Sequence, residues 1–430
     1  MTQNYLSGDS SVNIAASVES AVFAGKLPSG SLLPPVRTLA AELRVSPATV
    51  AAAYRLLRDR GVVIADGRRG TRVRPAPPLS QPRAVPLPKG VRDLSDGNPD
   101  HALLPRPRNV PFDQRLYGDD LNEPRLIELA REQFQEDRIP AEHIAVVSGA
   151  LDGLERVLRE HLRPGDRVIV EDPCFTGVLD LLTALSLAPV PVAVDDEGLI
   201  PEPLRRAIRS ASAIIVTPRA QNPFGAALTP RRARELRAIL ATRAELLVIE
   251  DDHAGAVAGA EYLSLIDRSR ERWAVVRSVS KSLGPDLRVA LLASDPQTHA
   301  RVEGRQTLGI RWVSHILQRV VVALWRDRAP ARAGRVYAER RHALLRELRS
   351  RGIAAHGASG LNVWVPVAEE SATVQALLHA GWAVKAGERY RLASPPAIRV
   401  TVATLLPADA ARFADDLAAI IAPARRTSGA

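Results

Sequence analysis

The stretch RWAVVRSVSKSLGPDLRVA, residues 272–290, places Lys281 between two serines and ahead of a Gly-Pro turn. The chain has 58 Lys and Arg residues, and only four of them are lysines: Lys26, Lys89, Lys281 and Lys385. Arginine supplies charge and bidentate hydrogen bonds at least as well as lysine, but it cannot lose its proton. A desolvated lysine can lose its proton and attack a carbonyl carbon. We therefore interpret Lys281 as a Schiff-base lysine. The stretch alone leaves open that it is an ordinary loop lysine.

The composition is that of an ordinary folded protein. With 430 residues, 46% hydrophobic and 25% charged, the chain suits two or three domains and is not disordered. Its single cysteine, Cys174, excludes an internal disulfide and suits a reducing compartment. The polar N-terminus has no signal-peptide pattern, and no apolar run reaches the roughly 20 residues that a membrane span needs. We expect a cytoplasmic protein without a membrane partner.

A proline-rich stretch divides the chain. RPAPPLSQPRAVPLPKG, residues 74–90, has few large apolar residues and should form an extended spacer. After it, short apolar runs that end in Ser, Gly, Asp or Pro alternate with helical patterns, which is typical of a mostly parallel α/β sheet. From about residue 330 the pattern changes to a long helix, short strands and a final helix, which predicts a smaller α+β part. The predicted organisation is a small module at 1–75, a linker at 76–94 and a body at 95–425, divided into a large part at about 125–325 and a small part at about 326–425.

In the N-terminal module, the sequence pattern predicts three helices followed by a hairpin. Residues 1–75 carry ten Lys and Arg against five Asp and Glu, which permits a nucleic-acid partner. Before the third helix, Ser46 is a good N-cap and Pro47 fits the first helical position. Small residues and Thr49 on that helix suit close approach to base edges in the DNA major groove. By physical chemistry alone, the module could equally be a basic bundle that only packs.

A Schiff-base lysine raises the question of its carbonyl partner. Pyridoxal 5′-phosphate (PLP) needs an amine, a carboxylate at its pyridine nitrogen, a phosphate cradle and a partner for the ring face. In VVSGALDGL, Gly149 and Ala150 can aim backbone N–H groups at a phosphate. Phe175 follows a strand end, where it could stack on a ring, and Asn222 lies in a turn, where it could bind the phenolic oxygen. Taken singly, these three features are more often an ordinary turn, a core residue and an Asn-Pro turn.

The carboxylate comes from LLVIEDDH, which ends a buried strand. Ligand sites of parallel α/β sheets lie beyond the carboxyl ends of strands, so Asp251 could keep the pyridine nitrogen protonated; helix capping is its alternative role. Ser278 and Arg288 stand on either side of Lys281, and both suit a phosphate. Each signal is weak alone, whereas the ordered set favours PLP.

Two family resemblances strengthen both predictions. LPSGSLLPPVRTLAAELRVSPATVAAAYRLLRDRGVV…GRRGTRV resembles the winged helix-turn-helix of the GntR family. That resemblance implies contacts with double-stranded DNA from Arg37, Ser46, Thr49, Arg68, Arg69 and Gly70. The sequence differs from the family pattern at Pro47, where the family usually has Arg. This difference puts one DNA contact in doubt.

From about residue 95, the Asn-Pro-x-Gly turn, the strand-end Asp and the Ser-x-x-Lys…Arg stretch resemble the fold-type I, class I/II aminotransferases. This implies a homodimer in which Tyr117 reaches the phosphate of the partner subunit, and it implies that Arg399 binds an α-carboxylate. The family usually carries Tyr where this chain has His253. A histidine can donate the same bond to the cofactor, but its charge can change near neutral pH.

Together, head, linker and body resemble the MocR-type regulators, with EDDH, SVSKSLGPDLR and RWVSHILQ most like the PtsJ-like subgroup. The first hypothesis is a PLP-dependent transcriptional regulator that senses PLP or an amino compound through an aldimine at Lys281, with a link to vitamin B6 homeostasis. The second is an active aminotransferase with an appended DNA-binding module, because Lys281, Asp251, Asn222 and Arg399 form a nearly complete catalytic set. The well-formed head, which an enzyme would not require, favours the regulator.

Overall fold

The computed structural model describes residues 6–65, 70–74, 86–107, 110, 113, 115–325 and 327–422. We describe the N-terminal head, residues 6–74, and the body, residues 86–422, each by itself. Within these described ranges, none of the helices combines the length and hydropathy that crossing a bilayer requires.

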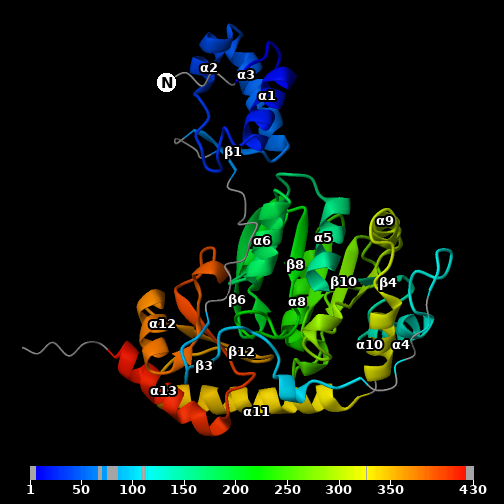
Figure 1. The fold of residues 1–430 in the computed structure, drawn as a ribbon, viewed down its shortest axis with the longest axis vertical. Helices are drawn as coiled ribbons and strands as arrows, with labels where there is room; N and C mark the ends of the chain where they lie inside the picture. Colours follow the sequence, from blue (N-terminus) through cyan, green and yellow to red (C-terminus); the bar gives the residue numbers. More distant parts are fainter. Residues whose placement is uncertain are drawn as a thin grey trace, which may run out of the picture. The chain divides into compact units, whose positions relative to one another are not determined.

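The head consists of three helices and a two-stranded sheet, as the sequence predicts. The elements are α1 (Ser11–Phe23), α2 (Val36–Leu43), α3 (Pro47–Asp59), β1 (Val63–Ala65) and β2 (Thr71–Val73). Val50, Tyr54 and Leu57 of α3 are buried in a core that also takes Ile14 and Leu39. The strands β1 and β2 pair antiparallel. Together these elements form a helix-turn-helix with a two-stranded sheet (Figure 1).

A local hydrogen bond determines where α3 begins. The Oγ atom of Ser46 accepts a hydrogen bond from the backbone N–H of Thr49 at 3.0 Å, and Pro47 occupies the first turn. Arg44, with a φ of 55°, ends α2 in the left-handed conformation, so the chain reverses sharply between the two helices. The turn therefore holds α2 against α3.

An eight-stranded mixed sheet forms the larger part of the body (Figure 1). Its order is β4 (Ile144–Val147), β11 (Ala290–Ser294), β10 (Trp273–Ser278), β9 (Leu247–Asp252), β8 (Ala213–Val216), β5 (Arg167–Asp172), β6 (Ala188–Asp195) and β7 (Gly198–Leu199). The strands β8, β9 and β10 are parallel, whereas β11 runs antiparallel to both of its neighbours. Since β4 and β10 both oppose β11, they share one direction, and the expected mostly parallel sheet is confirmed.

Helices cover both faces of this sheet. The helix α8 (Pro230–Leu240) shares a hydrophobic core with Ile214 and Val248. On the other face, Gly153 of α5 (Ala150–His161) lies so close to the sheet that a Cβ there would stand 3.0 Å from Val276 and 3.1 Å from Val147. Further helices of this part are α4 (Pro124–Glu136), α6 (Thr176–Ala184), α7 (Pro201–Ala207), α9 (Pro296–Thr307) and α10 (His315–Leu324).

The small part is built on a three-stranded sheet in the order β12 (Asn362–Pro366), β15 (Ala397–Thr401), β14 (Lys385–Ala386). Helices α11 (Ala329–Ser350), α12 (Glu370–His379) and α13 (Pro407–Ile421) pack with it, and α11 lies along α13 (Figure 1). A separate pair joins β13 (Trp382–Ala383) to β3 (Arg92–Asp93). The strand β3 lies inside the stretch predicted as linker, and Leu94 after it is fully buried in the core of the small part.

The cap of α3 gives a first prediction. Ser46→Ala should destabilise the start of α3 by about 1 kcal/mol, because the N–H of Thr49 loses the Ser46 Oγ acceptor and keeps only the carbonyl oxygen of residue 46. Hydrogen exchange at the amides of Thr49 and Val50 in the full chain should accelerate several-fold. Ser20→Ala is the matched control, since Ser20 is an exposed residue near the end of α1. Equal exchange in both variants would contradict the capping role.

Candidate functional site

The predicted cofactor residues of the body gather at one edge of the large sheet, except for Tyr117 and Arg399. The strands β4, β5, β8, β9 and β10 end there. Gly149, Phe175, Asp251 and Lys281 each lie at or just beyond a strand end, and Asn222 lies in the turn that follows β8. Parallel strands bring their carboxyl ends to the same edge, which is where α/β proteins form ligand sites. Arg399 joins this group from the small sheet.

Lys281 is largely buried and its amine is held in place. Its Nζ atom donates a hydrogen bond to the carbonyl oxygen of Gly97 at 2.8 Å. Burial lowers the pKa of Lys281, and the nearby guanidinium of Arg399 lowers that pKa further, although Asp96 opposes the shift. A lowered pKa raises the fraction of neutral amine, which is the form that attacks a carbonyl.

Arg399 and Asn222 are in direct contact. A guanidinium nitrogen of Arg399 donates to Asn222 Oδ1 at 3.2 Å, and another donates to the carbonyl oxygen of Ser95 at 2.5 Å. Arg399 is 3% exposed, and its guanidinium lies 5.1 Å from the centre of the Tyr390 ring. The structure therefore places a buried cation beside Lys281, as an α-carboxylate site requires.

Asp251 is a buried carboxylate with an unsatisfied oxygen. It is 5% exposed, and among the described residues none donates a hydrogen bond to its Oδ1 atom. Burial raises the pKa of Asp251 to about 7, with a smaller contribution from Asp252. Glu171, on β5, is also buried, and its pKa is likewise raised to about 7, chiefly by burial. Such a carboxyl group is costly to ionise unless a cationic donor comes to it.

Asp252, the residue after Asp251, lies in a different environment, between two arginines. It accepts hydrogen bonds from Arg219 at 2.9 and 3.0 Å and from Arg277 at 2.6 Å. These two arginines hold the pKa of Asp252 well below its usual range, against the opposing effect of burial. The sequence analysis missed this ion-pair cluster. The alternation of EDDH along a strand could have revealed it, because residues 250 and 252 face opposite to residue 251.

His253 follows Asp252 at the end of β9. Burial lowers the pKa of His253 to about 4, and the charge of Lys281 lowers it further. The imidazole is therefore neutral at pH 7 instead of titrating there. A neutral imidazole keeps one N–H donor, so it can still donate to a phenolic oxygen.

The predicted phosphate cradle brings Gly149 and Arg288 together. β11 pairs Ala290 with Val147, which sets Arg288 beside the turn after β4. Arg288 donates to the carbonyl oxygen of Ser148 at 3.0 Å, and a Cβ on Gly149 would stand 2.7 Å from its guanidinium. Gly149 has a φ of 98°, and Ala150 is the first residue of α5. A helix N-terminus with an arginine beside it is a good site for a phosphate.

Three predicted residues are less closely tied to this site. Ser278 is buried and its Oγ lies 3.0 Å from Ser280 Oγ. Phe175 is partly buried just after β5. Tyr117 is 81% exposed and packs with Trp312 at 5.6 Å between ring centres, so within one chain it does not reach Lys281 by any described contact.

In the head, the predicted DNA-binding residues occupy its surface. Arg37 on α2 and Ser46 before α3 are exposed, and Thr49 is partly exposed. Gly70 is exposed and has a φ of 99°. Arg68 and Arg69 lie outside the described residues.

The geometry of the body fits PLP. The unsatisfied Oδ1 of buried Asp251 lacks the donor that a protonated pyridine nitrogen would supply. Lys281 has the lowered pKa that reaction with an aldehyde needs. The space beside Gly149, which a Cβ would fill, lies against Arg288 and a helix N-terminus. These three features lie at or after the ends of strands β9, β10 and β4, and each fits a different part of a PLP molecule.

Comparison with known proteins identifies both parts of the chain. Residues 116–417 match the family model "Aminotransferase class I and II", and residues 10–73 match "Bacterial regulatory proteins, gntR family". The chain is 39% identical over 429 residues to the vitamin B6 salvage pathway transcriptional repressor PtsJ of Salmonella typhimurium, covering 96% of this chain and 98% of that protein. It is 29% identical over 306 residues to the pyridoxine biosynthesis transcriptional regulator PdxR of Corynebacterium glutamicum, covering 66% of each.

Solved structures show the fold of the body. Pyrococcus horikoshii kynurenine aminotransferase matches with a TM-score of 0.69 at 19% identity, covering 77% of this chain and 91% of that one. An archaeal alanine:glyoxylate aminotransferase matches with a TM-score of 0.68 at 20% identity, covering 77% and 90%. The chain therefore belongs to the MocR-type transcriptional regulators, in which a GntR-type helix-turn-helix head precedes a body of the class I and II aminotransferase fold.

Proposed function

We propose that this protein is a DNA-binding regulator of vitamin B6 metabolism that senses PLP through covalent attachment to Lys281. One observation carries the proposal: the unsatisfied Asp251 carboxylate and the Lys281 amine of lowered pKa lie at the same sheet edge, in a chain that also carries a GntR head. The similarity to PtsJ, a vitamin B6 salvage repressor, supports PLP as the effector. We further propose that it acts in the cytoplasm as a homodimer, in which the exposed Tyr117 meets the partner subunit.

In this proposal each residue has a separate task. Asp251 would bind the pyridine N–H as a carboxylate, and Phe175 would pack on the ring. The helix N-terminus at Ala150, with Ser278 and Arg288, would hold the phosphate. Neutral His253 and Asn222 donate to the phenolic oxygen. The bound cofactor supplies an aldehyde carbon for the Lys281 amine and an electron-withdrawing ring.

A short segment next to the predicted linker offers a route from this site to the head. Lys281 donates to the carbonyl oxygen of Gly97, and Arg399 donates to that of Ser95. The N–H of Thr401 donates to the carbonyl oxygen of Leu94 at 2.8 Å, which anchors the start of the segment. A covalent bond at Lys281 Nζ would change the hydrogen bond that this atom donates to Gly97. Ligand binding would then change the contacts that hold residues 95–97. These residues directly follow the predicted linker to the head, so the change would favour one arrangement of the heads.

Transamination is a second candidate, favoured by the buried Arg399 guanidinium close to Lys281. It predicts that an added amino acid converts bound PLP to the amine form of the cofactor. The absorption spectrum of the PLP-loaded protein, followed after addition of single amino acids, tests it. A spectrum that does not change supports the regulator alone.

The central experiment is DNA-binding anisotropy on the region upstream of the protein's own gene, at fixed salt, with and without PLP. We expect PLP to change the affinity for this DNA but not the affinity for a scrambled sequence. If specific binding is the same with and without PLP, then PLP is not the effector.

Lys281→Ala should abolish both the covalent attachment and the response to PLP. The alanine has no amine, so borohydride treatment should leave no added mass on the protein, and DNA affinity should be the same with and without PLP. Lys385→Ala is the matched control, because Lys385 is an exposed lysine on β14. A PLP response that survives in Lys281→Ala would refute sensing through this residue.

Asp251→Asn should have opposite effects on cofactor binding and on stability. PLP should bind at least tenfold more weakly, because the amide carries no charge for the pyridine N–H. The PLP-free variant should be more stable than the wild type, since the raised pKa of Asp251 makes its ionisation costly in the folded state. This advantage should grow between about pH 4 and pH 7, the range between its unfolded and folded pKa values, and level off above that.

Thermal unfolding across this pH range measures the effect. Asp286→Asn, at an exposed position a short distance along the chain from Lys281, is the control and should change neither property. If Asp251→Asn binds PLP more weakly but is no more stable than the wild type, then ionisation of Asp251 does not destabilise the PLP-free protein.

Arg37→Ala tests the head. Loss of one phosphate contact should weaken binding to all DNA sequences alike and lower the slope of log affinity against log salt by about 0.9. Arg346→Ala, at an exposed arginine of the body, should leave the slope unchanged. If the two variants give equal slopes, Arg37 does not contact a phosphate.

A further inference from the structure

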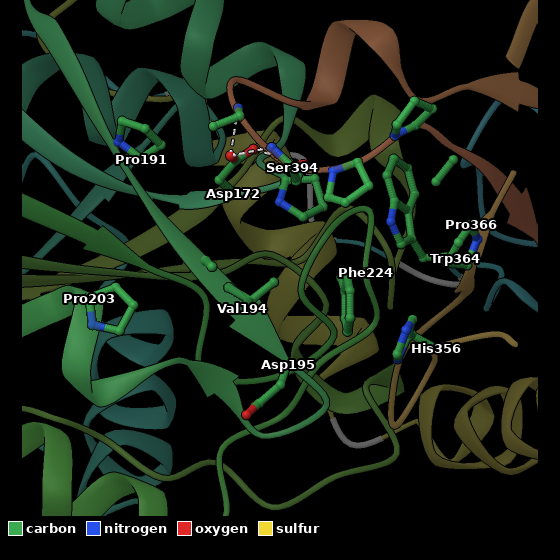
Figure 2. A pocket seen from close by; sticks show the side chains of 16 residues that line it. Asp172, Pro191, Val194, Asp195, Pro203, Phe224, His356, Trp364, Pro366 and Ser394 are labelled. Carbon is green, nitrogen blue, oxygen red and sulfur yellow. Dashed lines mark hydrogen bonds between the residues drawn. The ribbon is translucent and has the colours of Figure 1, made fainter. Parts of the chain in front are cut away.

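A cavity of about 560 Å³ opens between β6 of the large sheet and the small part of the body. Figure 2 shows Pro191, Val194 and Pro203 on one side and Phe224, His356 and Trp364 on the other. None of the residues assigned above to PLP lines this cavity. Its volume lies in the range of small-molecule sites.

The walls of the cavity are apolar and stiff. Six of its sixteen lining residues are prolines: Pro173, Pro191, Pro203, Pro366, Pro395 and Pro396. A proline has no backbone N–H and a fixed φ, so these walls offer few donors and need little ordering when a ligand binds. Opposite β6, the Phe224 and His356 rings stack with centres 4.3 Å apart at an angle of 24°, and Trp364 lies beside them. Aromatic walls of this kind favour a flat ring.

The two carboxylates that line the cavity already accept hydrogen bonds from the protein. The Asp172 carboxylate accepts hydrogen bonds from the N–H groups of Leu392, Ala393 and Ser394 at 2.8 to 2.9 Å, and from the Ser394 hydroxyl at 3.0 Å (Figure 2). Asp195 accepts from Arg232 at 2.8 and 2.9 Å. A ligand therefore gains more from apolar contact than from new hydrogen bonds.

The charged residues that line the cavity disfavour anions. Two of the lining residues are aspartates, and no Lys or Arg is among the sixteen described residues that line the cavity. Asp196 adds a third carboxylate, 3.2 Å from Nδ1 of His356. A phosphate or carboxylate group would find no Lys or Arg in the lining, and the nearby Arg232 is already paired with Asp195, so PLP itself does not suit this cavity.

We propose that this cavity is a second small-molecule site, which takes a flat aromatic compound without a negative charge. The cavity is separate from the PLP site, and the energy of binding comes from stacking between the Phe224–His356–Trp364 wall and the prolines of the large part.

Isothermal titration calorimetry of the full, PLP-saturated protein with indole tests the proposal. We expect one indole per chain, and at least tenfold weaker binding of indole-3-acetate, which adds a carboxylate to the same ring. Ala193→Trp, an exposed β6 position in the lining, should fill the cavity and weaken indole binding at least tenfold. Ala354→Trp is the matched control at an exposed alanine outside the lining and should bind as the wild type does.

Absence of indole binding, or equal binding by wild type and Ala193→Trp, would overturn the proposal. Equal affinity for indole and indole-3-acetate would also overturn it, because the charged residues of the lining would then not select. If Ala193→Trp does not fold, Pro366→Trp fills the cavity from the opposite wall and carries the same expectation.

Discussion

The candidate PLP site depends on a carboxylate that the fold buries without satisfying it. Asp251 lies at the end of β9, the central strand of three parallel ones, and burial raises its pKa to about 7. An unsatisfied carboxyl group of this kind is unfavourable in the free protein and becomes favourable when a cationic donor binds. The adjacent Asp252 is neutralised by Arg219 and Arg277, so the same strand end holds one carboxylate for the fold and one for a ligand.

Much of this arrangement could be predicted from the sequence, because parallel strands bring their carboxyl ends to one edge. Residues that directly follow apolar runs, such as Gly149, Asp251 and Lys281, therefore come together whatever the details of packing. The partners of Asp252 could not be predicted in this way. Arg219 and Arg277 lie 33 and 25 residues away along the chain, and only the register of the folded sheet brings them to it.

The role of residues 95–97 could not be predicted for a different reason. Their contacts with Lys281 and Arg399 use backbone carbonyl oxygens, which every residue type provides. Of these residues, only Gly97 has a residue type that the contacts restrict, because its φ is 71° and a Cβ there would stand 3.2 Å from the Arg399 guanidinium. A segment that acts through its backbone leaves almost no pattern in a single sequence.

The two sites in the body share structural elements, and this has a thermodynamic consequence. Phe224 of the aromatic wall lies in the same turn as Asn222, and Ala397 of the cavity lies on β15 two residues before Arg399. The N–H of Ser359 donates to the carbonyl oxygen of Gly225 at 2.8 Å, which ties that turn to the small part. A ligand that stiffens this wall also limits how Asn222 and Arg399 can adjust around PLP. Any change it causes in PLP affinity must be matched by an equal effect of PLP on its own binding.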